Sequence, residues 1–323
     1  LSLFYCIPPH EIYAFNLIGK DQGRRVSDYV FTHELPAFHQ WRNSHQKSNG
    51  QSIQLLQDKY KLWLTFQKQA VPMVPILKLI PRNAPLDFSD CRSHSAHLIC
   101  KPRYGSAGKG IFVLKFGETD NRLDIFQTRS GAISAPGTLD CLQDATARED
   151  YLVQPFVINH PLLADLCPTG DAVTIRIITE LKECREPCCY CAILEVAAVE
   201  KEGSRPHDTE SEGSFHVLLP VDPASGETQR FPGDIFKPSF GNHYNRVYGK
   251  MCGKKIPFWR QMLKTAFVAH SRFNDIHAIA WDFVVSADAP LLLEGNTGWG
   301  TAVPQIIKGG LLAETPSSHL PLP

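Results

Sequence analysis

Near the C-terminal end of the chain, two short apolar stretches predict a pair of adjacent strands. The first runs from residue 277 to residue 285 and contains one acid, Asp282, and the second ends with Glu294 and Asn296. The polar segment 286–290 between them is typical of a turn, so the two strands are expected to form a hairpin. Side chains two residues apart on a strand point to the same face, which places Glu294 and Asn296 together and Asp282 opposite them.

Upstream, the hydrophobic pattern predicts one helix followed by a β-rich segment. Apolar residues recur at helical spacing from Gln51 to Lys68, and a proline-containing extended connector follows at 71–75. Residues 97–114 show an apolar stretch, a glycine-rich loop and a second apolar stretch, which predicts two strands joined by that loop. From residue 170 to 179 polar and apolar residues alternate, so Arg176 is expected to share one face of a strand with the residues two positions away.

The remaining segments are less regular. Residues 117–150 are typical of variable loop and edge structure, and Pro155, inside an apolar segment, favours an edge strand or a crossover between lobes. Residues 200–213 are polar and rich in turn-forming types, which indicates a mobile loop and, near a site, a lid. A strand is expected at 215–220, and an amphipathic helix is expected at 257–273.

The composition describes a globular protein without a strong electrostatic preference. The chain has 323 residues, of which 43% are hydrophobic and 20% are charged, so a substantial core is expected. Its 33 basic residues balance 33 acidic ones, which argues against nucleic acid or an anionic membrane as the main partner. No apolar stretch reaches the roughly 18 residues of a membrane span, and residues 1–7 lack the features of a secretion signal. We therefore expect a soluble, cytoplasmic protein.

The ten cysteines do not form the dense framework of a small secreted domain, so reduced thiols are expected. Four of them, Cys184, Cys188, Cys189 and Cys191, lie close together in the sequence and could place thiolates around zinc. The paired C-x-x-C spacing of zinc knuckles is missing, and a strand-like segment follows the cluster. A hairpin turn with incidental cysteines is the favoured interpretation, and a metal site is the alternative.

Asp282, Glu294 and Asn296 present hard oxygen ligands on neighbouring predicted strands. Such ligands suit Mg²⁺ that is shared with a substrate phosphate, because magnesium keeps near-octahedral geometry and is rarely enclosed by protein alone. The alternative is a surface hairpin whose acids are only solvated. The hairpin by itself does not decide between these two interpretations.

The glycine-rich loop between the two upstream strands has the features of a phosphate-binding flap. Gly105, Gly108 and Gly110 allow sharp turns that bring backbone N–H groups against phosphate oxygens, and Lys101 before the loop can reach the same oxygens. The pattern differs from a P-loop, because Lys109 is followed by glycine and then by a strand. An ordinary hairpin is the alternative, although it rarely needs so many glycines between lysines.

Arg176 lies among β-branched residues on its predicted strand. An arginine in such surroundings is seldom buried without an anion, so the position suggests a phosphate or carboxylate ligand. The alternative is a surface arginine on an edge strand.

Taken in order, these short motifs resemble the ATP-grasp superfamily, most closely the branch associated with sugar-transfer and cell-surface polysaccharide genes. The resemblance covers residues 52 to 305, and its specificity comes from the order of the motifs, since each one is short. The motifs are Asp58-Lys59, Lys101-Pro102 before the glycine loop, a hinge strand at Gln154 to Val157, Thr174-Ile175-Arg176, Gly253-x-x-Ile256-Pro257-x-Trp259, Trp281-Asp282 and Glu294-Gly295-Asn296.

The resemblance implies an α+β ATP-grasp fold, in which two α+β lobes hold the nucleotide between them. It implies an ATP-grasp domain at 53–305, with a smaller flap lobe at about 72–153 and a metal-binding lobe at about 154–305. Residues 1–52 would form an N-terminal region in which the usual preceding domain is shortened or replaced. Residues 306–323 would form a tail.

The resemblance also implies the cofactors ATP and Mg²⁺, with Mn²⁺ as an alternative metal. Arg176 would stabilise the transferring phosphoryl group, and Asp282, Glu294 and Asn296 would hold the metal. Gln154 is a departure, because many relatives have Glu at this hinge position. The residues implied for ATP are Lys59, Lys101, Gly105, Ser106, Gly108, Lys109, Gly110, Gln154 and Val157.

Most relatives of this kind join a carboxylate to an amine or a similar nucleophile through an acyl phosphate. The resemblance therefore implies a carboxylate-amine or carboxylate-thiol ligase in cell-surface polysaccharide or secondary-metabolite biosynthesis, with a small-molecule acid and amine as partners. Phosphoryl transfer to a carboxylate needs charge neutralisation and the positioning of two anions that repel, which lysines, an arginine and magnesium together supply. The alternatives are a phosphotransferase that stops at a phosphorylated product and a nucleotide-binding module without turnover.

Overall fold

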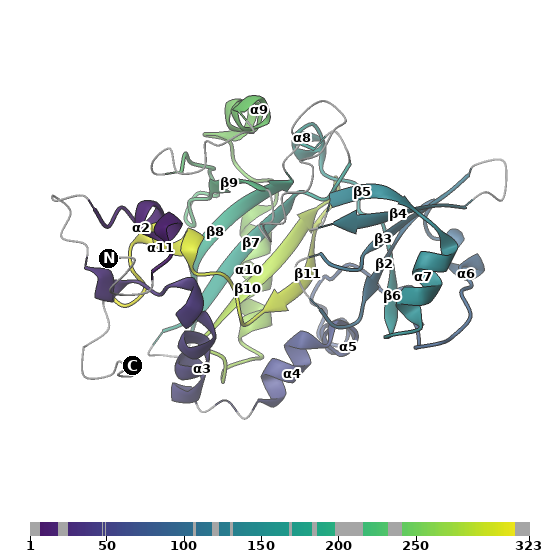
Figure 1. The fold of residues 1–323 in the computed structure, drawn as a ribbon, viewed down its shortest axis with the longest axis horizontal. Helices are drawn as coiled ribbons and strands as arrows, with labels where there is room; N and C mark the ends of the chain where they lie inside the picture. The colour runs from purple at the N-terminus through teal and green to yellow at the C-terminus, as the bar shows by residue number, and fades with distance from the viewer. Residues whose placement is uncertain are drawn as a thin grey trace.

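Two antiparallel sheets, one with six strands and one with five, form the body of the protein (Figure 1). The computed structural model describes residues 7–18, 25–46, 48, 50–105, 108–117, 123–129, 132–167, 170–182, 186–197, 216–231 and 241–313. No helix within these ranges is both long enough and apolar enough to cross a bilayer. Different helices accompany the two sheets, and the cleft between the sheets is lined by most of the predicted site residues.

The six-stranded sheet has the strand order β1-β6-β2-β3-β4-β5. Its strands are β1 (Lys78–Ile80), β2 (His97–Pro102), β3 (Phe112–Phe116), β4 (Leu123–Arg129), β5 (Ala132–Gly137) and β6 (Tyr151–Pro155). The expected pair of strands around the glycine loop is confirmed, because β2 and β3 pair with Cys100 opposite Phe112. Helices α6 (Ser89–Arg92) and α7 (Leu139–Thr146) accompany this sheet.

Two predictions for this sheet are only partly confirmed, since β5 is an edge strand and β6 is followed by a crossover, but regular structure was missed. Residues 117–150, expected as loop and edge structure, contain β4, β5 and helix α7, whose N-cap Thr138 accepts a hydrogen bond from the Cys141 backbone. Strand β6 is not an edge strand, because it lies between β1 and β2. Pro155 is tolerated there because it is the last residue of the strand. The crossover was expected correctly, since the chain leaves β6 through α8 (Pro161–Ala164) and enters the other sheet.

The five-stranded sheet has the strand order β11-β10-β7-β8-β9. Its strands are β7 (Thr174–Leu181), β8 (Pro187–Ala197), β9 (His216–Pro220), β10 (Ala278–Val285) and β11 (Pro290–Asn296). The predicted hairpin is confirmed, with Asp282 opposite Glu294. Helix α10 (Trp259–His270) packs against β7, β8 and β10, and every residue of β10 is buried.

Alternation along β10 separates the core from the site. Trp281 contacts the rings of Phe66 and Phe273 in the large core. Asp282, the next residue, therefore points to the opposite face. Gly295 lies against this core as well, because a Cβ atom there would come within 2.4 Å of the Trp281 ring. The glycine between Glu294 and Asn296 thus lets β11 approach the core closely while its neighbours face the cleft.

The single helix expected from Gln51 to Lys68 is two helices, α4 (Gln51–Gln57) and α5 (Lys59–Gln67). Asp58 between them adopts an extended conformation, and its carboxylate accepts a hydrogen bond from the Lys61 backbone at 3.1 Å. An aspartate in this position caps the N-terminus of the second helix and favours the interruption. Leu62 and Phe66 of α5 are fully buried in the large core.

The N-terminal region packs onto the end of the chain (Figure 1). Its elements are α2 (Pro9–Ala14), η1 (Val26–Asp28), η2 (Thr32–Glu34) and α3 (Leu35–His45), and the later helices are α9 (Gly241–Met251) and α11 (Ala302–Lys308). The Gln305 amide forms two hydrogen bonds with the Val30 backbone, at 2.8 and 2.7 Å. Helix α11 continues past residue 306, where the resemblance implies the start of a tail. Phe15 and Phe31 belong to the large core.

The described cysteines of the cluster lie on strand β8 and not in the turn before it. Burial raises the pKa of Cys189 and of Cys191 to about 12. Burial therefore disfavours the thiolate form of both cysteines. Cys184 and the expected loop at 200–213 lie outside the described residues.

Candidate functional site

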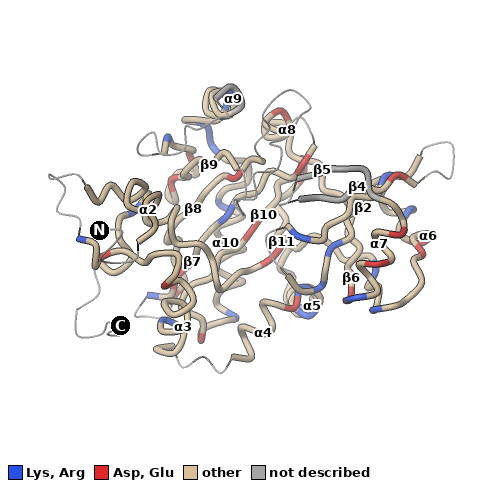
Figure 2. The backbone as a smooth tube through the Cα atoms, in the orientation of Figure 1, with Lys and Arg blue, Asp and Glu red and all other residues tan. Residues whose placement is uncertain are grey.

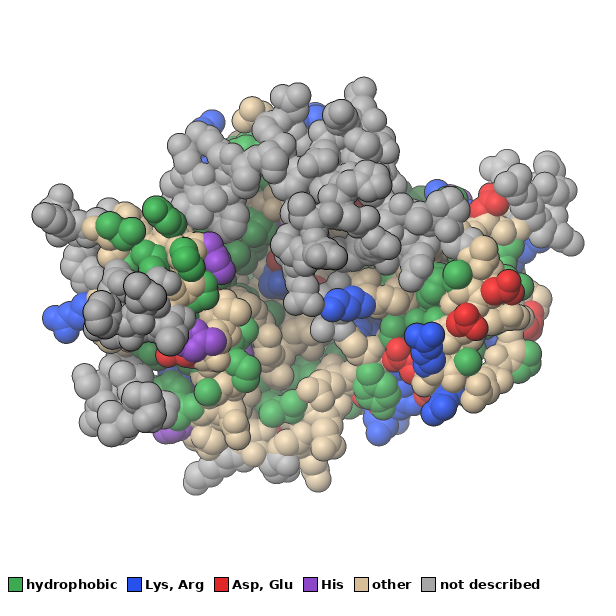
Figure 3. All heavy atoms as spheres, viewed as in Figure 1, with side chains coloured by type: hydrophobic (Ala, Val, Ile, Leu, Met, Phe, Trp, Pro, Cys, Tyr) green, Lys and Arg blue, Asp and Glu red, His purple; other side chains and the backbone are tan. Residues whose placement is uncertain are grey.

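A cleft of about 950 Å³ lies between the two sheets and is lined by residues of both. Acidic and basic positions of β7, β10 and β11 lie near the middle of the molecule (Figure 2). Lys and Arg side chains are also visible near the middle of the face shown in Figure 3. The volume is at the upper end of the range for small-molecule sites, so the cleft can hold more than one substrate.

The hairpin β10–β11 brings the three predicted metal-binding side chains together. The Asn296 amide nitrogen donates to Asp282 Oδ2 at 3.3 Å and to Glu294 Oε1 at 3.1 Å. All three residues line the cleft. One polar group therefore lies between two carboxylates on adjacent strands.

Arg176 on β7 lies beside the same hairpin. Its Nε and Nη2 atoms donate to the two oxygens of Asp282 at 2.8 and 3.0 Å, and its Nη1 lies 3.1 Å from Glu195 Oε1. Two carboxylates of the chain itself therefore pair with Arg176, and 31% of its side chain remains exposed. The expected shared face of β7 is observed, because Thr174, Arg176 and Ile178 all line the cleft.

Burial and charge act against each other at the two acids. Burial raises the pKa of Asp282 above its ordinary value, and the Arg176 guanidinium limits this rise. Burial also pushes the pKa of Glu294 upward, but Lys59 and Lys101 outweigh it and leave this pKa below its ordinary value. Nearby cations therefore favour the charged form of both carboxylates.

The donor set of the hairpin fits Mg²⁺. The two carboxylates are hard oxygen ligands. The oxygen and nitrogen ends of the Asn296 amide have nearly the same shape, so a half-turn of this amide would place its oxygen beside the two carboxylates. These residues would fill only part of an octahedral shell, which leaves room for phosphate oxygens and water. The described residues contain no group of three or more His, Cys, Asp and Glu placed to hold a metal. An all-protein metal cage is therefore absent from the described chain.

Two lysines from different elements face the acids. Lys59, the first residue of α5, places Nζ 3.5 Å from Glu294 Oε2 and 2.5 Å from the Gly105 carbonyl oxygen. Lys101 near the end of β2 is only 8% exposed, and burial lowers its pKa to about 8 although Glu294 acts in the opposite direction. Both lysines line the cleft. A phosphate group between them and the hairpin would meet two cations.

The glycine loop needs glycines for conformational reasons. Gly105, Gly108 and Gly110 have φ values of 110°, 67° and 72°, a region that other residues rarely adopt. Gly105, Gly108 and Lys109 line the cleft, as expected for a phosphate flap. Gly110 is not among the lining residues, and its carbonyl instead accepts a hydrogen bond from the Tyr151 hydroxyl at 3.0 Å. Ser106 lies outside the described residues.

The hinge residues Gln154 and Val157 also line the cleft. The Gln154 side chain is buried and donates to the Val74 carbonyl oxygen at 3.0 Å, which fixes its amide to the connector before β1. A neutral amide can make this bond, whereas a carboxylate could not donate it.

Sequence reasoning missed several residues that shape the site. Glu195 lines the cleft between Arg176 and Thr174, and its signal was a lone acid in the apolar strand β8, like Asp282 in β10. Arg103 pairs with Asp58 across 45 positions of sequence, and no local pattern indicates that contact.

Three solved structures illustrate how the chain compares with known proteins. D-alanine--D-alanine ligase from Bacillus anthracis, complexed with ATP, is 11% identical, with a TM-score of 0.44 over 79% of this chain and 61% of that chain. D-alanyl-alanine synthetase A from Vibrio cholerae O1 biovar eltor is 12% identical, with a TM-score of 0.44 over 83% and 63%. Biotin carboxylase from Campylobacter jejuni is 12% identical, with a TM-score of 0.41 over 83% and 48%. The chain thus spans less than two thirds of each of these proteins.

No curated protein matches the chain. Residues 44–317, however, match the family described as sugar-transfer associated ATP-grasp. This match extends over the glycine loop, the β10–β11 hairpin and both lysines of the cleft. The α+β fold with two antiparallel sheets is the one expected from the sequence. The chain is therefore a member of the sugar-transfer associated ATP-grasp family.

Proposed function

We propose that the protein is an ATP-dependent ligase that joins a small-molecule carboxylate to an amine, or to a thiol, through an acyl phosphate. The observation that carries this proposal is the convergence of Lys59, Lys101 and Arg176 with Asp282 and Glu294 in one cleft. Cations opposite carboxylates suit a reaction in which a metal-bound phosphoryl group passes to a second anion. Family membership supports ATP as the donor.

Each part of the chain has a distinct role in this proposal. Lys59, Lys101 and the glycine loop bind the nucleotide phosphates, and Gln154 with Val157 forms the adenine pocket. Asp282, Glu294 and Asn296 hold Mg²⁺ or Mn²⁺, which when bound would neutralise phosphate charge. The exposed edge of Arg176 faces the cleft beyond Asp282, where it would stabilise the transferred group. The acid and the nucleophile would then bind on the exposed side of Arg176.

An assay without the natural amine tests the reaction type. The protein is mixed with Mg-ATP, a library of carboxylic acids and hydroxylamine, which converts an acyl phosphate to a stable hydroxamate. A ligase yields hydroxamate with ADP and phosphate, and mass spectrometry then identifies the acid. A phosphotransferase yields ADP with a stable phosphorylated product, and a binding module binds Mg-ATP without releasing ADP. Either of the last two results contradicts ligase chemistry.

The variant Glu294→Ala controls for contaminating activities in this assay. We expect it to lose hydroxamate formation while its melting temperature stays close to that of the original protein, because a side chain at the cleft contributes little to the core. Unchanged activity in Glu294→Ala would remove the metal assignment. Repeating the assay over a range of Mg²⁺ concentrations shows whether the loss reflects weaker metal binding.

A further inference from the structure

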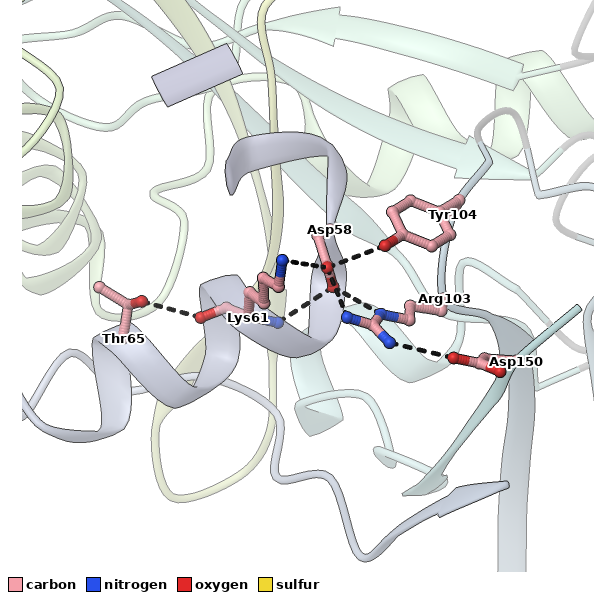
Figure 4. A network of polar contacts seen from close by, with 6 residues as sticks. All are labelled: Asp58, Lys61, Thr65, Arg103, Tyr104 and Asp150. Atoms are coloured by element: carbon pink, nitrogen blue, oxygen red, sulfur yellow. Dashed lines mark hydrogen bonds and ion pairs between the residues drawn. The ribbon is translucent and has the colours of Figure 1, made fainter. Parts of the chain in front are cut away.

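An ionic network joins the start of helix α5 to the end of strand β2 (Figure 4). The two oxygens of Asp58 accept from Arg103 Nε at 2.8 Å and from Arg103 Nη2 at 2.6 Å. Tyr104 donates its hydroxyl to Asp58 at 3.0 Å, and Arg103 Nη1 lies 3.0 Å from Asp150. The network thus holds three segments that are distant in sequence.

The Asp58–Arg103 pair at the centre of the network is largely buried, whereas Tyr104 and Asp150 are partly exposed. Asp58 is 2% exposed, and the Arg103 side chain is 16% exposed. Burial acts to raise the pKa of Asp58, but hydrogen bonds from Arg103, Tyr104 and the Lys61 backbone outweigh it and lower this pKa. Loss of one partner would leave the other buried and uncompensated, so the pair is energetically coupled.

Backbone hydrogen bonds strengthen the same junction. The Arg103 N–H donates to the Asp150 carbonyl oxygen at 2.9 Å, and the Lys59 N–H donates to the Arg103 carbonyl oxygen at 3.3 Å. The Arg103 guanidinium also lies 5.7 Å from the Tyr60 ring centre. Residue 103 is therefore fixed on one side to the start of β6 and on the other to the start of α5.

The residues next to the network belong to the proposed phosphate site. Lys59 follows Asp58, and Gly105, which begins the glycine loop, lies two residues after Arg103. The Lys59 ammonium contacts the Gly105 carbonyl and the Glu294 carboxylate. Asp58 and Arg103 themselves are not among the residues that line the cleft. Any effect of this pair on a ligand would have to act through its neighbours that line the cleft, which are Lys59, Tyr104 and the loop.

We propose that Asp58 and Arg103 are positioning residues that hold Lys59 and the base of the glycine loop in one fixed arrangement around the nucleotide phosphates. This inference rests on the proposed function for the identity of the ligand. The planar fork of arginine is central to it, because it bonds both oxygens of Asp58 and still reaches Asp150. A misplacement of about 1 Å can cost on the order of a hundredfold in a precisely arranged site.

The substitution Arg103→Lys tests the inference, because it keeps the charge and removes the fork. We expect the dissociation constant of Mg-ATP, measured by calorimetry, to rise by about tenfold to a hundredfold. In the working enzyme, KM for ATP should rise more than KM for the acid. Asp165→Asn, which breaks the exposed ion pair between Asp165 and Lys250, is the control and should change neither quantity.

A second pair of variants distinguishes positioning from a general loss of stability. Asp58→Asn and Arg103→Gln should each weaken Mg-ATP binding, and their combination should be no worse than the more severe single variant, since the pair acts as a unit. Additive losses would contradict the coupling. A fall in melting temperature that is accompanied by equal losses for ATP and acid would show a merely structural role.

Hydrogen exchange of the free protein gives a readout that does not depend on ATP. Arg103→Lys should speed exchange at the backbone amides of residues 59 and 103, whose hydrogen bonds hold the junction, and at residues 108–111 of the loop. Unchanged exchange together with unchanged Mg-ATP affinity would overturn the inference. If the original protein bound no Mg-ATP, the proposed function would fail, while the exchange result would still decide whether the pair fixes the loop.

Discussion

In the proposed reaction Arg176 would have two roles, whereas the sequence suggested only contact with an anion. Its fork bonds both oxygens of Asp282, and a third nitrogen contacts Glu195. This arrangement orients a carboxylate that we assign to the metal, and it leaves about a third of the arginine side chain open to the cleft. The same residue can therefore fix the metal ligand and face the transferred group.

The substitution Arg176→Lys should reduce turnover far more than ATP affinity. Lysine keeps the positive charge but cannot bond both oxygens of Asp282 while also facing the cleft. We expect the single-turnover rate to fall by about 100-fold or more, the scale for removal of one preorganised donor, and the Mg²⁺ requirement to increase. Lost affinity with a normal rate would instead identify Arg176 as a ground-state binding residue, and no change in either would make it an ordinary surface arginine.

Lys101 should make nucleotide binding sensitive to alkaline pH. Its pKa lies at about 8 in the free protein, because burial disfavours the ammonium. Phosphate favours the ammonium, so binding above pH 8 requires proton uptake and should weaken by up to about tenfold per pH unit. Folding stability should depend on pH in the opposite direction to ATP binding. The free energy of unfolding should rise as the pH increases from 8 toward the ordinary lysine pKa of 10.5, because the unfolded chain then binds more protons at Lys101.

Calorimetry of Mg-ATP binding between pH 7 and 9.5 checks this expectation. Lys101→Arg carries a charge that does not titrate in this range, so its affinity should be nearly independent of pH. Lys101→Ala should bind weakly at every pH. An affinity that stays constant in the original protein would show that Lys101 does not bind the phosphates.

Individual site residues could be predicted where they lie on one strand or on one short hairpin. Asp282, Glu294 and Asn296 follow from the two-residue period of a strand and from a short turn, and the structure brings them within hydrogen-bonding distance. Glu195 had a local signal as a lone acid in β8, but its pairing with Arg176 of β7 could not be predicted, and no local pattern indicated the pairing of Arg103 with Asp58. Side-chain periodicity describes one element and does not specify which elements meet.

At the scale of elements, the interruption between α4 and α5 illustrates the same limit. Apolar residues continue at helical spacing on both sides of Asp58, so the pattern predicts one helix. The break depends on the carboxylate of Asp58, which caps α5 and also pairs with Arg103 from β2. A capping residue inside a periodic segment was the available local signal. Strands β4 and β5 were missed for another reason, since residues 117–150 do not alternate clearly.

Packing of α10 on the sheet should make the protein sensitive to acid. His270, the last residue of α10, is fully buried, and burial lowers its pKa to about 4. Its Nδ1 lies 2.6 Å from the Thr179 hydroxyl and its Nε2 lies 3.0 Å from the Ile276 carbonyl oxygen, which suits a neutral ring. The neutral His270 ring therefore contributes its full share to the free energy of unfolding above the ordinary histidine pKa of 6.5. This contribution is lost as the pH falls toward 4.

Equilibrium unfolding in urea at pH 7 and at pH 4.5 measures this effect. The lowered pKa of His270 corresponds to a loss of about 3 kcal/mol in the free energy of unfolding at acid pH, where the ring of the unfolded chain is charged. His270→Gln should lower stability at pH 7 and flatten the pH dependence, whereas the exposed His33→Gln should leave the slope unchanged. Equal slopes for the original protein and His270→Gln would show that other groups cause the acid sensitivity.

At the scale of the whole molecule, the N-terminal region and the end of the chain support the site together. The ring of His39 on α3 is hydrogen-bonded to the Trp299 carbonyl oxygen at 2.9 Å, and Trp299 lines the cleft after β11. Phe15 and Phe31 join the same large core as Trp281. The sequence could not reveal this contact, because it joins segments from opposite ends of the chain and neither segment contains a motif.

The junction between the two ends should therefore unfold together with the rest of the protein. Gln305 bonds both the N–H and the carbonyl of Val30, and all of these groups are buried. Gln305→Ala leaves the buried Val30 N–H without a partner, and the Val30 carbonyl oxygen keeps only the longer 3.4 Å hydrogen bond from the Thr301 hydroxyl. A buried group left unsatisfied costs about 1–3 kcal/mol. We expect a single urea transition with a lower midpoint and an unchanged slope, while Gln143→Ala on the exposed face of α7 should shift stability by no more than about 0.5 kcal/mol. A separate early transition of the N-terminal region, with the main transition unmoved, would show instead that residues 7–46 form an independent unit.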